Sequence, residues 1–367
     1  MWYKPTHEAS IYTPAVLVFP DRIEENIRRM IKLAGTAERL RPHVKTHKMA
    51  ELIRLQLEHG IRKFKCATLT EVEMVAANGG EDILLAYPLT GPAIGHFLNL
   101  LERFPEVIFA GSVDSKAVAQ KLSDEASLRG VKLRVFVDLD NGMHRTGIAP
   151  DQADELINFI LNNQNLSLGG FHIYDGHIHE KDVAKREVHC NRDFESVNSL
   201  VEKMEEKGIE VRELACGGTP TFPIHARYGS RTLCPGTPLL WDAGYAGAMP
   251  DLDFLPAAVL ATRVISKPGE SVCLDLGYKA VASEMPHPRV KFLELGVHEV
   301  INHSEEHMVV SSPEFSKLSI GEMVYALPIH VCPTIALHEQ VYVIEGQNLI
   351  DVWKVSARSR NYKYEEG

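Results

Sequence analysis

The 367-residue chain lacks the sequence features of several protein classes. Its six cysteines lie far apart and include no Cys-x-x-Cys pair, which favours reduced thiols over a disulfide scaffold. No run approaches the ~20 apolar residues of a membrane helix, and the N-terminal residues contain no apolar signal core. Basic residues are outnumbered by acidic ones, 39 to 49, so we expect neither nucleic acid nor an anionic membrane as a partner. These absences together predict a cytoplasmic protein.

The composition that remains is typical of a globular protein, with 45% hydrophobic and 24% charged residues. A chain of this length exceeds one ordinary core, so we expect two domains. In residues 12–250, short β-rich runs alternate with amphipathic stretches, which predicts an α/β fold, a TIM-type (β/α)8 barrel. The eight predicted strands are 15–19, 40–46, 63–67, 83–87, 107–110, 133–137, 166–171 and 211–215. An open doubly wound sheet is the alternative, but no glycine fingerprint for a dinucleotide follows the first strand.

The pattern changes in residues 251–367, where strand-like runs and turns replace helical periodicity. This predicts a smaller C-terminal β domain, and residues 1–11 are candidates for packing with it. The predicted strands of this domain are 255–266, 271–275, 291–298, 307–311, 323–327 and 340–345.

The segment 41–48, Arg-Pro-His-Val-Lys-Thr-His-Lys, places basic side chains where a barrel strand should end. In an extended segment Arg41, His43, Lys45 and His47 share one face. Neighbouring cations disfavour an ammonium ion, so we expect a lowered pKa for Lys45 and a free amine able to hold a Schiff base. A solvated basic turn or an anion-binding patch is the alternative interpretation.

Other polar loops follow the later predicted strands, at 140–147, 174–179 and 216–221. The loops after the last barrel strands commonly bind phosphate, because glycine lets a ligand approach backbone N–H groups. This predicts a phosphate site at Gly217, Gly218 and Thr219, with Gly236 and Thr237 in a second loop. A tight turn is the alternative for each glycine-rich loop.

A histidine and a cysteine, His330 and Cys332, stand two residues apart before Pro333-Thr334. In a strand both would face one way and could bind one metal ion. Thiolate and imidazole favour zinc, and a site with only two protein ligands suits Lewis-acid catalysis. A buried cysteine beside a core histidine is the alternative. Further histidines near the barrel loops, such as His177, are given no role beyond support of a site.

Several of these segments resemble one known family. The segment 41–48 resembles the pyridoxal phosphate lysine motif of the D-threonine aldolase and eukaryotic-type D-serine dehydratase family, part of the alanine racemase-like group. The resemblance implies that Lys45 binds the cofactor, that Arg145 lies beside the oxygen of its ring, and that Tyr174 contacts it. The family carries a metal-binding His-x-Cys or His-x-Asp before Pro-Thr, which His330 and Cys332 match.

The resemblance implies a lyase that requires pyridoxal phosphate and a divalent metal (zinc or manganese) and acts on small D-β-hydroxy-α-amino acids. We expect retro-aldol cleavage of the D-threonine aldolase type, with His47 as the base. β-Elimination of the D-serine dehydratase type, with Lys45 as the base, is the first alternative. A racemase and a non-catalytic pyridoxal phosphate carrier are further alternatives. We also expect a homodimer.

Overall fold

The computed structural model describes residues 1–296 and 298–360, which form two compact units. The first unit comprises Met1–Arg29, Thr46–Glu51 and Thr237–Arg358. The second comprises Met30–Lys45 and Leu52–Gly236, together with residues 359 and 360. The domain boundary expected between residues 250 and 251 stays a prediction, and residues 361–367 of the expected β domain lie outside the described residues.

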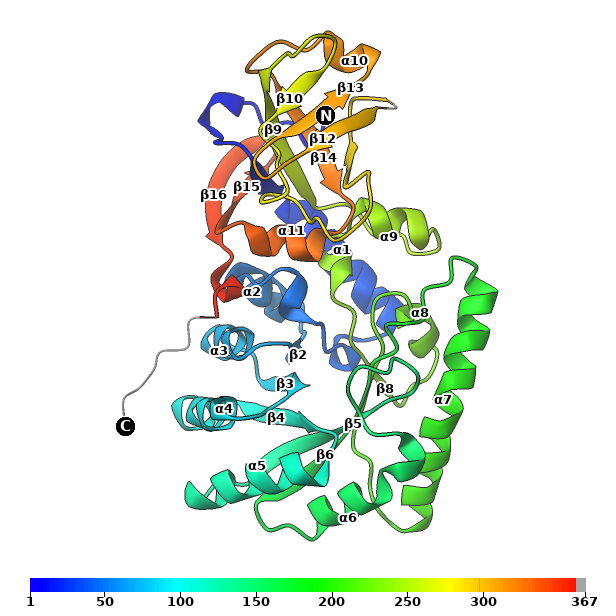
Figure 1. Cartoon of the computed structure of the whole chain (residues 1–367). Coiled ribbons are helices and arrows are strands. Elements are labelled where there is room, and N and C mark those ends of the chain that lie inside the picture. The colour runs from blue at the N-terminus through cyan, green and yellow to red at the C-terminus, as the bar shows by residue number, and fades with distance from the viewer. Residues whose placement is uncertain (297, 361–367) are drawn as a thin grey trace. The chain divides into compact units, whose positions relative to one another are not determined.

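The second unit contains a parallel sheet whose strands follow one another in chain order (Figure 1). Leu84, Ala110, Phe136, Ala215 and Cys234 form a buried cluster from this sheet, in which small side chains leave room for the phenylalanine. The strands are β2 (Lys63–Cys66), β3 (Asp82–Pro88), β4 (Ile108–Val113), β5 (Leu133–Leu139), β6 (Leu166–Ile173), β7 (Leu214–Cys216) and β8 (Arg231–Leu233).

The segment Leu40 to His43 takes the place of a first barrel strand. Leu40 forms a parallel bridge with Leu233 of β8, and His43 forms one with Lys65 of β2. The Arg41 amide donates to the Leu233 carbonyl at 2.8 Å, and the Lys65 amide donates to the Pro42 carbonyl at 2.9 Å. The segment thus joins the two edges of the sheet, and the expected TIM-type fold is confirmed.

The strand assignment at the two ends of the barrel was wrong. Residues 15–19 were expected to form the first barrel strand, but β1 (Ala15–Val18) pairs with β9 and β15 of the other unit. All four residues of β1 are buried. A central strand of either sheet would show the same continuous apolar run, so the sequence does not reveal to which sheet β1 belongs. The short strand β8 was not predicted, because Arg231 and Thr232 interrupt its apolar character.

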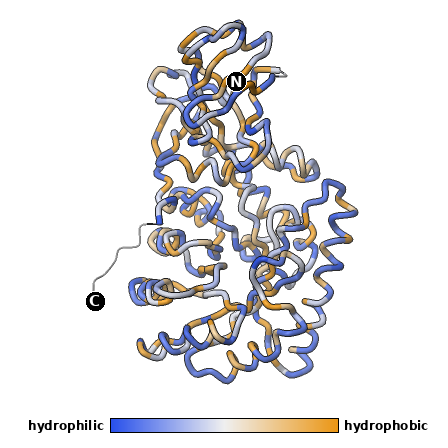
Figure 2. The backbone as a smooth tube through the Cα atoms, in the orientation of Figure 1, coloured by the Kyte–Doolittle hydropathy of each residue, from blue (hydrophilic) through white to orange (hydrophobic). Residues whose placement is uncertain are grey.

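Helices lie between the strands and pack on the sheet, as α3 does on β2 and β3. The longest, α7, is hydrophilic over most of its length and buries one stripe that includes Cys190, Phe194 and Val197 (Figure 2). Among the described residues, no helix combines the length and apolar character needed to cross a lipid bilayer. The helices of this region are α1 (Pro20–Ala34), α2 (Ala50–Glu58), α3 (Leu69–Ala77), α4 (Pro92–Arg103), α5 (Lys116–Leu128), α6 (Asp154–Leu161), α7 (Val183–Glu206) and α8 (Phe222–His225).

The first unit is built on a mostly antiparallel sheet, ordered β12-β13-β10-β9-β1-β15-β16, with β14 paired to β9 and β11 paired to β14. Residues near the N-terminus pack in this unit, where the Tyr325 hydroxyl donates to the Glu8 carboxylate at 2.7 Å. The smaller C-terminal β domain is therefore confirmed as a fold element. Its strands are β9 (Ala258–Ser266), β10 (Val272–Leu274), β11 (Val290–Phe292), β12 (Glu299–His303), β13 (Met308–Ser311), β14 (Met323–Pro328), β15 (Gln340–Glu345) and β16 (Asn348–Lys354).

Residues 251–367 lack helical periodicity in the sequence, yet they contain two short helices, α10 (Pro313–Ser316) and α11 (Val331–Leu337). A third short helix of this unit, α9 (Ala243–Ala248), precedes them. Each has seven residues or fewer, which is too short to give a repeating apolar period along the sequence.

One buried ion network fixes the closing segment of the barrel. The Arg41 side chain is fully buried and binds Glu213 through two bonds of 2.8 and 2.9 Å, and Asp82 at 2.9 Å. Burial alone would lower the pKa of Arg41, but the two carboxylates outweigh it and raise that pKa. Arg41 is therefore a structural cation of the barrel and is held away from solvent.

We predict that Arg41→Met lowers the free energy of unfolding by roughly 3–5 kcal/mol, because it leaves the largely buried Glu213 carboxylate without its partner and Asp82 with Arg134 alone. Lys116→Met provides the matched control, since the Lys116–Glu155 pair is exposed and worth at most about 1 kcal/mol. Urea unfolding of both variants measures the difference. Equal, small losses in the two variants would contradict the structural role of Arg41.

Candidate active site

Lys45 lies in a short 3-10 turn, Val44–Thr46, directly after the closing segment. The expected extended conformation of 40–46 is wrong from Val44 onward, so the four basic side chains do not share one face. Arg41 turns into its carboxylate network, and the Lys45 amide donates to His43 Nδ1 at 3.3 Å.

Cations do gather around one aromatic ring, but they come from separate segments of the barrel unit. The Tyr174 ring, after β6, has Lys45 Nζ at 5.7 Å, Lys65 Nζ at 5.3 Å and the Arg145 guanidinium at 4.8 Å from its centroid. The structure thus brings together three residues that the sequence predicted, Lys45, Arg145 and Tyr174. Lys65 was missed, although a charged residue on a buried strand is a signal in itself.

A buried polar chain supports this arrangement. Lys65 Nζ donates to His172 Nε2 at 3.1 Å, and His172 Nδ1 donates to Asp138 at 2.7 Å. Burial, followed by the charge of Lys65, lowers the pKa of His172. Burial would raise the pKa of Asp138, but His172 outweighs it and keeps that pKa low. A neutral imidazole therefore links an ammonium to a carboxylate, and sequence reasoning missed both His172 and Asp138.

The first of the predicted glycine loops borders the Tyr174 ring. Gly217 has φ +74°, and a Cβ on Gly218 would lie 3.1 Å from Tyr174 Cε2, so the loop passes the ring closely. The Gly236 amide donates to Thr219 Oγ1 at 3.4 Å, which joins the loops after β7 and β8. An aromatic ring, three cations and two glycine loops fit a planar aromatic cofactor that carries a phosphate.

Thr237, the last of the predicted phosphate-site residues, begins a 3-10 turn of the first unit. Its hydroxyl lies 3.8 Å from Cys332 Sγ. Its assignment to the phosphate site stays a prediction.

A second buried network lies behind the loop after β6. Asp175 accepts hydrogen bonds from Thr221 at 2.8 Å and from His225 Nε2 at 2.7 Å, while Arg231 donates to His225 Nδ1 at 2.9 Å. Burial raises the pKa of the nearby Cys190 thiol. Since both nitrogens of His225 are engaged, this network holds the loop instead of binding a ligand.

His47 is completely buried in the first unit. Burial, and then the charge of Lys48, lowers the pKa of His47 to about 3. The Met49 amide donates to His47 Nδ1 at 3.1 Å, and His47 Nε2 has no partner among the described residues. A buried nitrogen without a partner is rare, and it marks a place for a ligand atom.

The Met49 bond also selects the tautomer of His47. Because Nδ1 accepts a hydrogen bond from the backbone N–H, the neutral ring carries its proton on Nε2. The ring therefore donates at Nε2, and it accepts a proton there only after exchange to the Nδ1–H tautomer. The role of His47 as a base stays a prediction, with this tautomer exchange as a requirement.

His330 and Cys332 interact, but not through a strand. His330 is the N-cap of α11, and Cys332 lies in the first turn of that helix, so the expectation of a strand was wrong. Burial would lower the pKa of His330, but the Cys332 and Glu284 side chains raise it to about 9. Glu284 binds His330 Nδ1 at 2.5 Å, and Thr46 Oγ1 lies 3.1 Å from Cys332 Sγ.

This donor set fits a divalent metal. A carboxylate on one ring nitrogen commonly orients a histidine whose other nitrogen binds a metal, and Glu284 occupies that position. Sequence reasoning missed Glu284, which is 46 residues from His330.

Two family models match the chain. Residues 18–240 match the alanine racemase N-terminal domain, and residues 257–344 match a putative serine dehydratase domain. A D-threonine aldolase of Arthrobacter sp. is 28% identical over 95% of this chain and 93% of its own length. A 3-hydroxy-D-aspartate aldolase of Paracoccus denitrificans (strain Pd 1222) is 28% identical over 97% and 94%.

The crystal structure of D-threonine aldolase from Filomicrobium marinum has the same fold. It aligns with a TM-score of 0.86 and 24% identity, covering 97% of both chains. The aligned residues include those of both units.

We predict that His47 makes the apoprotein acid-sensitive. Its pKa is about 3 in the folded chain and about 6.5 when unfolded, so only the unfolded chain gains a proton as the pH falls through 6.5. Between pH 7 and pH 4.5 the wild type should lose about 2.5 kcal/mol more unfolding free energy than His47→Gln. Urea unfolding at both pH values measures this. His7→Gln, at an exposed histidine, is the control and should keep the pH dependence of the wild type. The same pH dependence in His47→Gln would contradict the assignment.

Proposed function

Because the chain belongs to the family of the alanine racemase N-terminal domain, we propose that it is a pyridoxal phosphate-dependent lyase that cleaves D-β-hydroxy-α-amino acids by a retro-aldol reaction. The observation that carries the proposal is the gathering of Lys45, Lys65 and Arg145 around the Tyr174 ring. The two aldolases similar to almost the whole chain favour carbon–carbon cleavage.

The residues of the barrel unit would bind and orient the cofactor. Lys45 would bind its aldehyde carbon, Tyr174 would lie against its ring, and Arg145 would stabilise negative charge on the ring oxygen. Backbone N–H groups of the loops at 217–219 and at 236–237 would hold the phosphate. Bound pyridoxal phosphate supplies an electron sink for the charge that develops at Cα.

Proton transfer at the β-hydroxyl would fall to His47. Its partnerless Nε2 is the atom available to a ligand, and its low pKa keeps the ring neutral at physiological pH. A ring that has exchanged its proton to Nδ1 can accept the hydroxyl proton at Nε2. The same nitrogen returns the proton in the direction of aldol addition.

We propose His330 and Cys332 as the ligands of a divalent metal, with Glu284 orienting the histidine. A thiolate ligand favours zinc over manganese. A metal there would supply Lewis acidity toward a hydroxyl. The cytoplasmic location and the homodimer stay predictions.

β-Elimination is the second candidate, favoured by the match of residues 257–344 to a putative serine dehydratase domain. In that reaction the Lys45 amine would remove the Cα proton, and the β-hydroxyl would leave. His47 would then matter less. The two reactions give different products, so they are separable by experiment.

We predict that the holoenzyme converts D-threonine to glycine and acetaldehyde with little ammonia, and that L-threonine is not cleaved. Lys45→Arg should be inactive, and His47→Ala should lower kcat by roughly 10²–10⁴, the range of general base catalysis. Chromatography of the products and an ammonia assay distinguish the outcomes. Ammonia as the main product from both D-threonine and D-serine would replace the aldolase with the dehydratase.

We predict that chelation of the metal abolishes turnover while the cofactor stays bound to Lys45, because the two groups have separate protein ligands. Cys332→Ala should lower kcat/KM by more than the roughly 10–100-fold typical of an orienting residue. Cys332→Asp should retain activity with Mn²⁺, since a carboxylate suits that ion. His307→Ala, an exposed histidine of the same unit, is the control. Full activity in verified metal-free enzyme would refute the role of the metal.

A further inference from the structure

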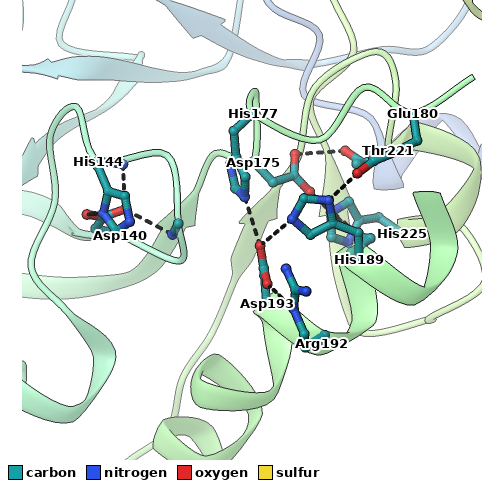
Figure 3. Close-up of polar contacts among 12 residues, drawn as sticks. Asp140, His144, Asp175, His177, Glu180, His189, Arg192, Asp193, Thr221 and His225 are labelled. Carbon is teal, nitrogen blue, oxygen red and sulfur yellow. Dashed lines mark hydrogen bonds and ion pairs between the residues drawn. The ribbon is translucent and has the colours of Figure 1, made fainter. Parts of the chain in front are cut away.

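Three potential metal ligands converge on one point beside helix α7, outside the residues placed in the active site (Figure 3). His177 belongs to the loop after β6, and His189 and Asp193 belong to α7. One ligand atom from each lies within 4.8 Å of the other two. The three side chains are partly buried, so the cluster is neither a loose surface group nor a closed core network.

The distances within the cluster suit one ion. Asp193 Oδ2 lies 2.8 Å from His177 Nε2 and 3.1 Å from His189 Nε2. Ligand atoms around a tetrahedral zinc ion, with bonds of about 2.0–2.1 Å, are separated by about 3.3 Å. A small outward movement of the side chains therefore admits an ion among them.

The other nitrogen of His189 carries an orienting carboxylate. Glu180 contacts His189 Nδ1, and its second oxygen, Oε2, is buried without a partner in the described part of the chain. If Nδ1–H of a neutral His189 ring donates a hydrogen bond to Glu180, Nε2 carries no proton. The lone pair of Nε2 then faces a lone pair of Asp193 Oδ2. A cation between these atoms removes the repulsion, and a carboxylate behind a metal-bound histidine is the usual arrangement.

The fold builds this geometry from two local features. His189 and Asp193 are four residues apart, so they share one face of α7. Gly142, in the loop after β5, has φ +125°, and a Cβ there would lie 2.8 Å from His177 Nε2. The absence of a side chain at residue 142 lets His177 turn toward the helix.

One side of the cluster is open to solvent. A surface depression is lined by Glu180, Ala184, Lys185, Val188, His189 and Arg192. Three protein ligands and an exposed side leave room for a water as the fourth ligand. Arg192 donates to the other oxygen of Asp193 at 2.8 Å, which holds that carboxylate in place.

We propose that His177, His189 and Asp193 form a second metal site, which binds a divalent transition-metal ion, with Zn²⁺ as its representative, and ties the loop after β6 to α7. Two imidazoles and one carboxylate select such an ion over Mg²⁺ or Ca²⁺. The site shares no residue with the set that would hold the cofactor, although His177 and Tyr174 stand in the same loop. It is also independent of His330 and Cys332, so each site can be removed without the other.

The test uses the full-length holoenzyme carrying His330→Ala and Cys332→Ala, which removes the two ligands proposed for the other metal. After dialysis against chelator, titration with Zn²⁺ followed by calorimetry should show one equivalent bound. Adding His189→Ala or Asp193→Asn should abolish that equivalent, and adding Glu180→Gln should weaken binding by about 10–100-fold. Co²⁺ should give visible tetrahedral absorption without a thiolate-to-cobalt band.

His144→Ala is the matched control, because His144 and Asp140 form another His–Asp contact at a four-residue spacing, with the histidine largely exposed. It should leave the bound equivalent unchanged. Zn²⁺ should raise the melting temperature of the background protein and of the His144 variant, but not of the Asp193→Asn protein. Asp193→Asn preserves the side-chain volume, so it keeps the test valid if His189→Ala fails to fold. No Zn²⁺ bound by the background protein, or equal binding in the cluster variants, would overturn the proposal and leave an ion-pair network.

Discussion

The hydrogen bonds that join Leu40 through His43 to β8 and β2 are the constraint on which the barrel unit depends. Without them the sheet would end at two open edges, and unpaired edges are costly. The closing segment is irregular and would be weak alone, so Arg41 fixes it through two carboxylates from distant parts of the chain. Lys45 follows His43, the last residue of the closing segment, by two residues, so the pairing of that segment fixes the backbone position of Lys45.

The polar groups around Tyr174 show what a parallel barrel does for chemistry. Lys45, Lys65 and Arg145 come from segments separated by 20 and 80 residues, yet each contacts the same ring. The carboxyl ends of parallel strands meet at one face, so separate loops can supply separate charges. The chain Lys65–His172–Asp138 then places a buried negative charge behind one of these cations, which offsets part of their mutual repulsion.

The sequence was most informative where chemistry is concentrated in a short motif. Lys45, Arg145 and Tyr174 each stand in a recognisable segment, and the barrel prediction followed from the alternation of strands and helices. Lys65, His172 and Glu284 were missed because their partners are 46 to 107 residues away, and although Lys65 stands out as a charge on a buried strand, no local pattern names its partner. The misplaced first strand has a related cause, since a fully buried strand does not reveal which sheet surrounds it. His330 and Cys332 were expected to face one way from a strand. They are instead brought close by the N-terminus of helix α11.

The hydrogen bond from the Met49 amide to His47 has a consequence for how this chain can vary. A backbone N–H group determines which ring nitrogen of His47 carries the proton. Changing the side chain at residue 49 therefore does not change the tautomer. Proline is different, because it has no N–H to donate. A proline at this position would free Nδ1 and let the ring take either tautomer. The tautomer of His47 is thus selected by a main-chain N–H group, which substitutions other than proline leave in place.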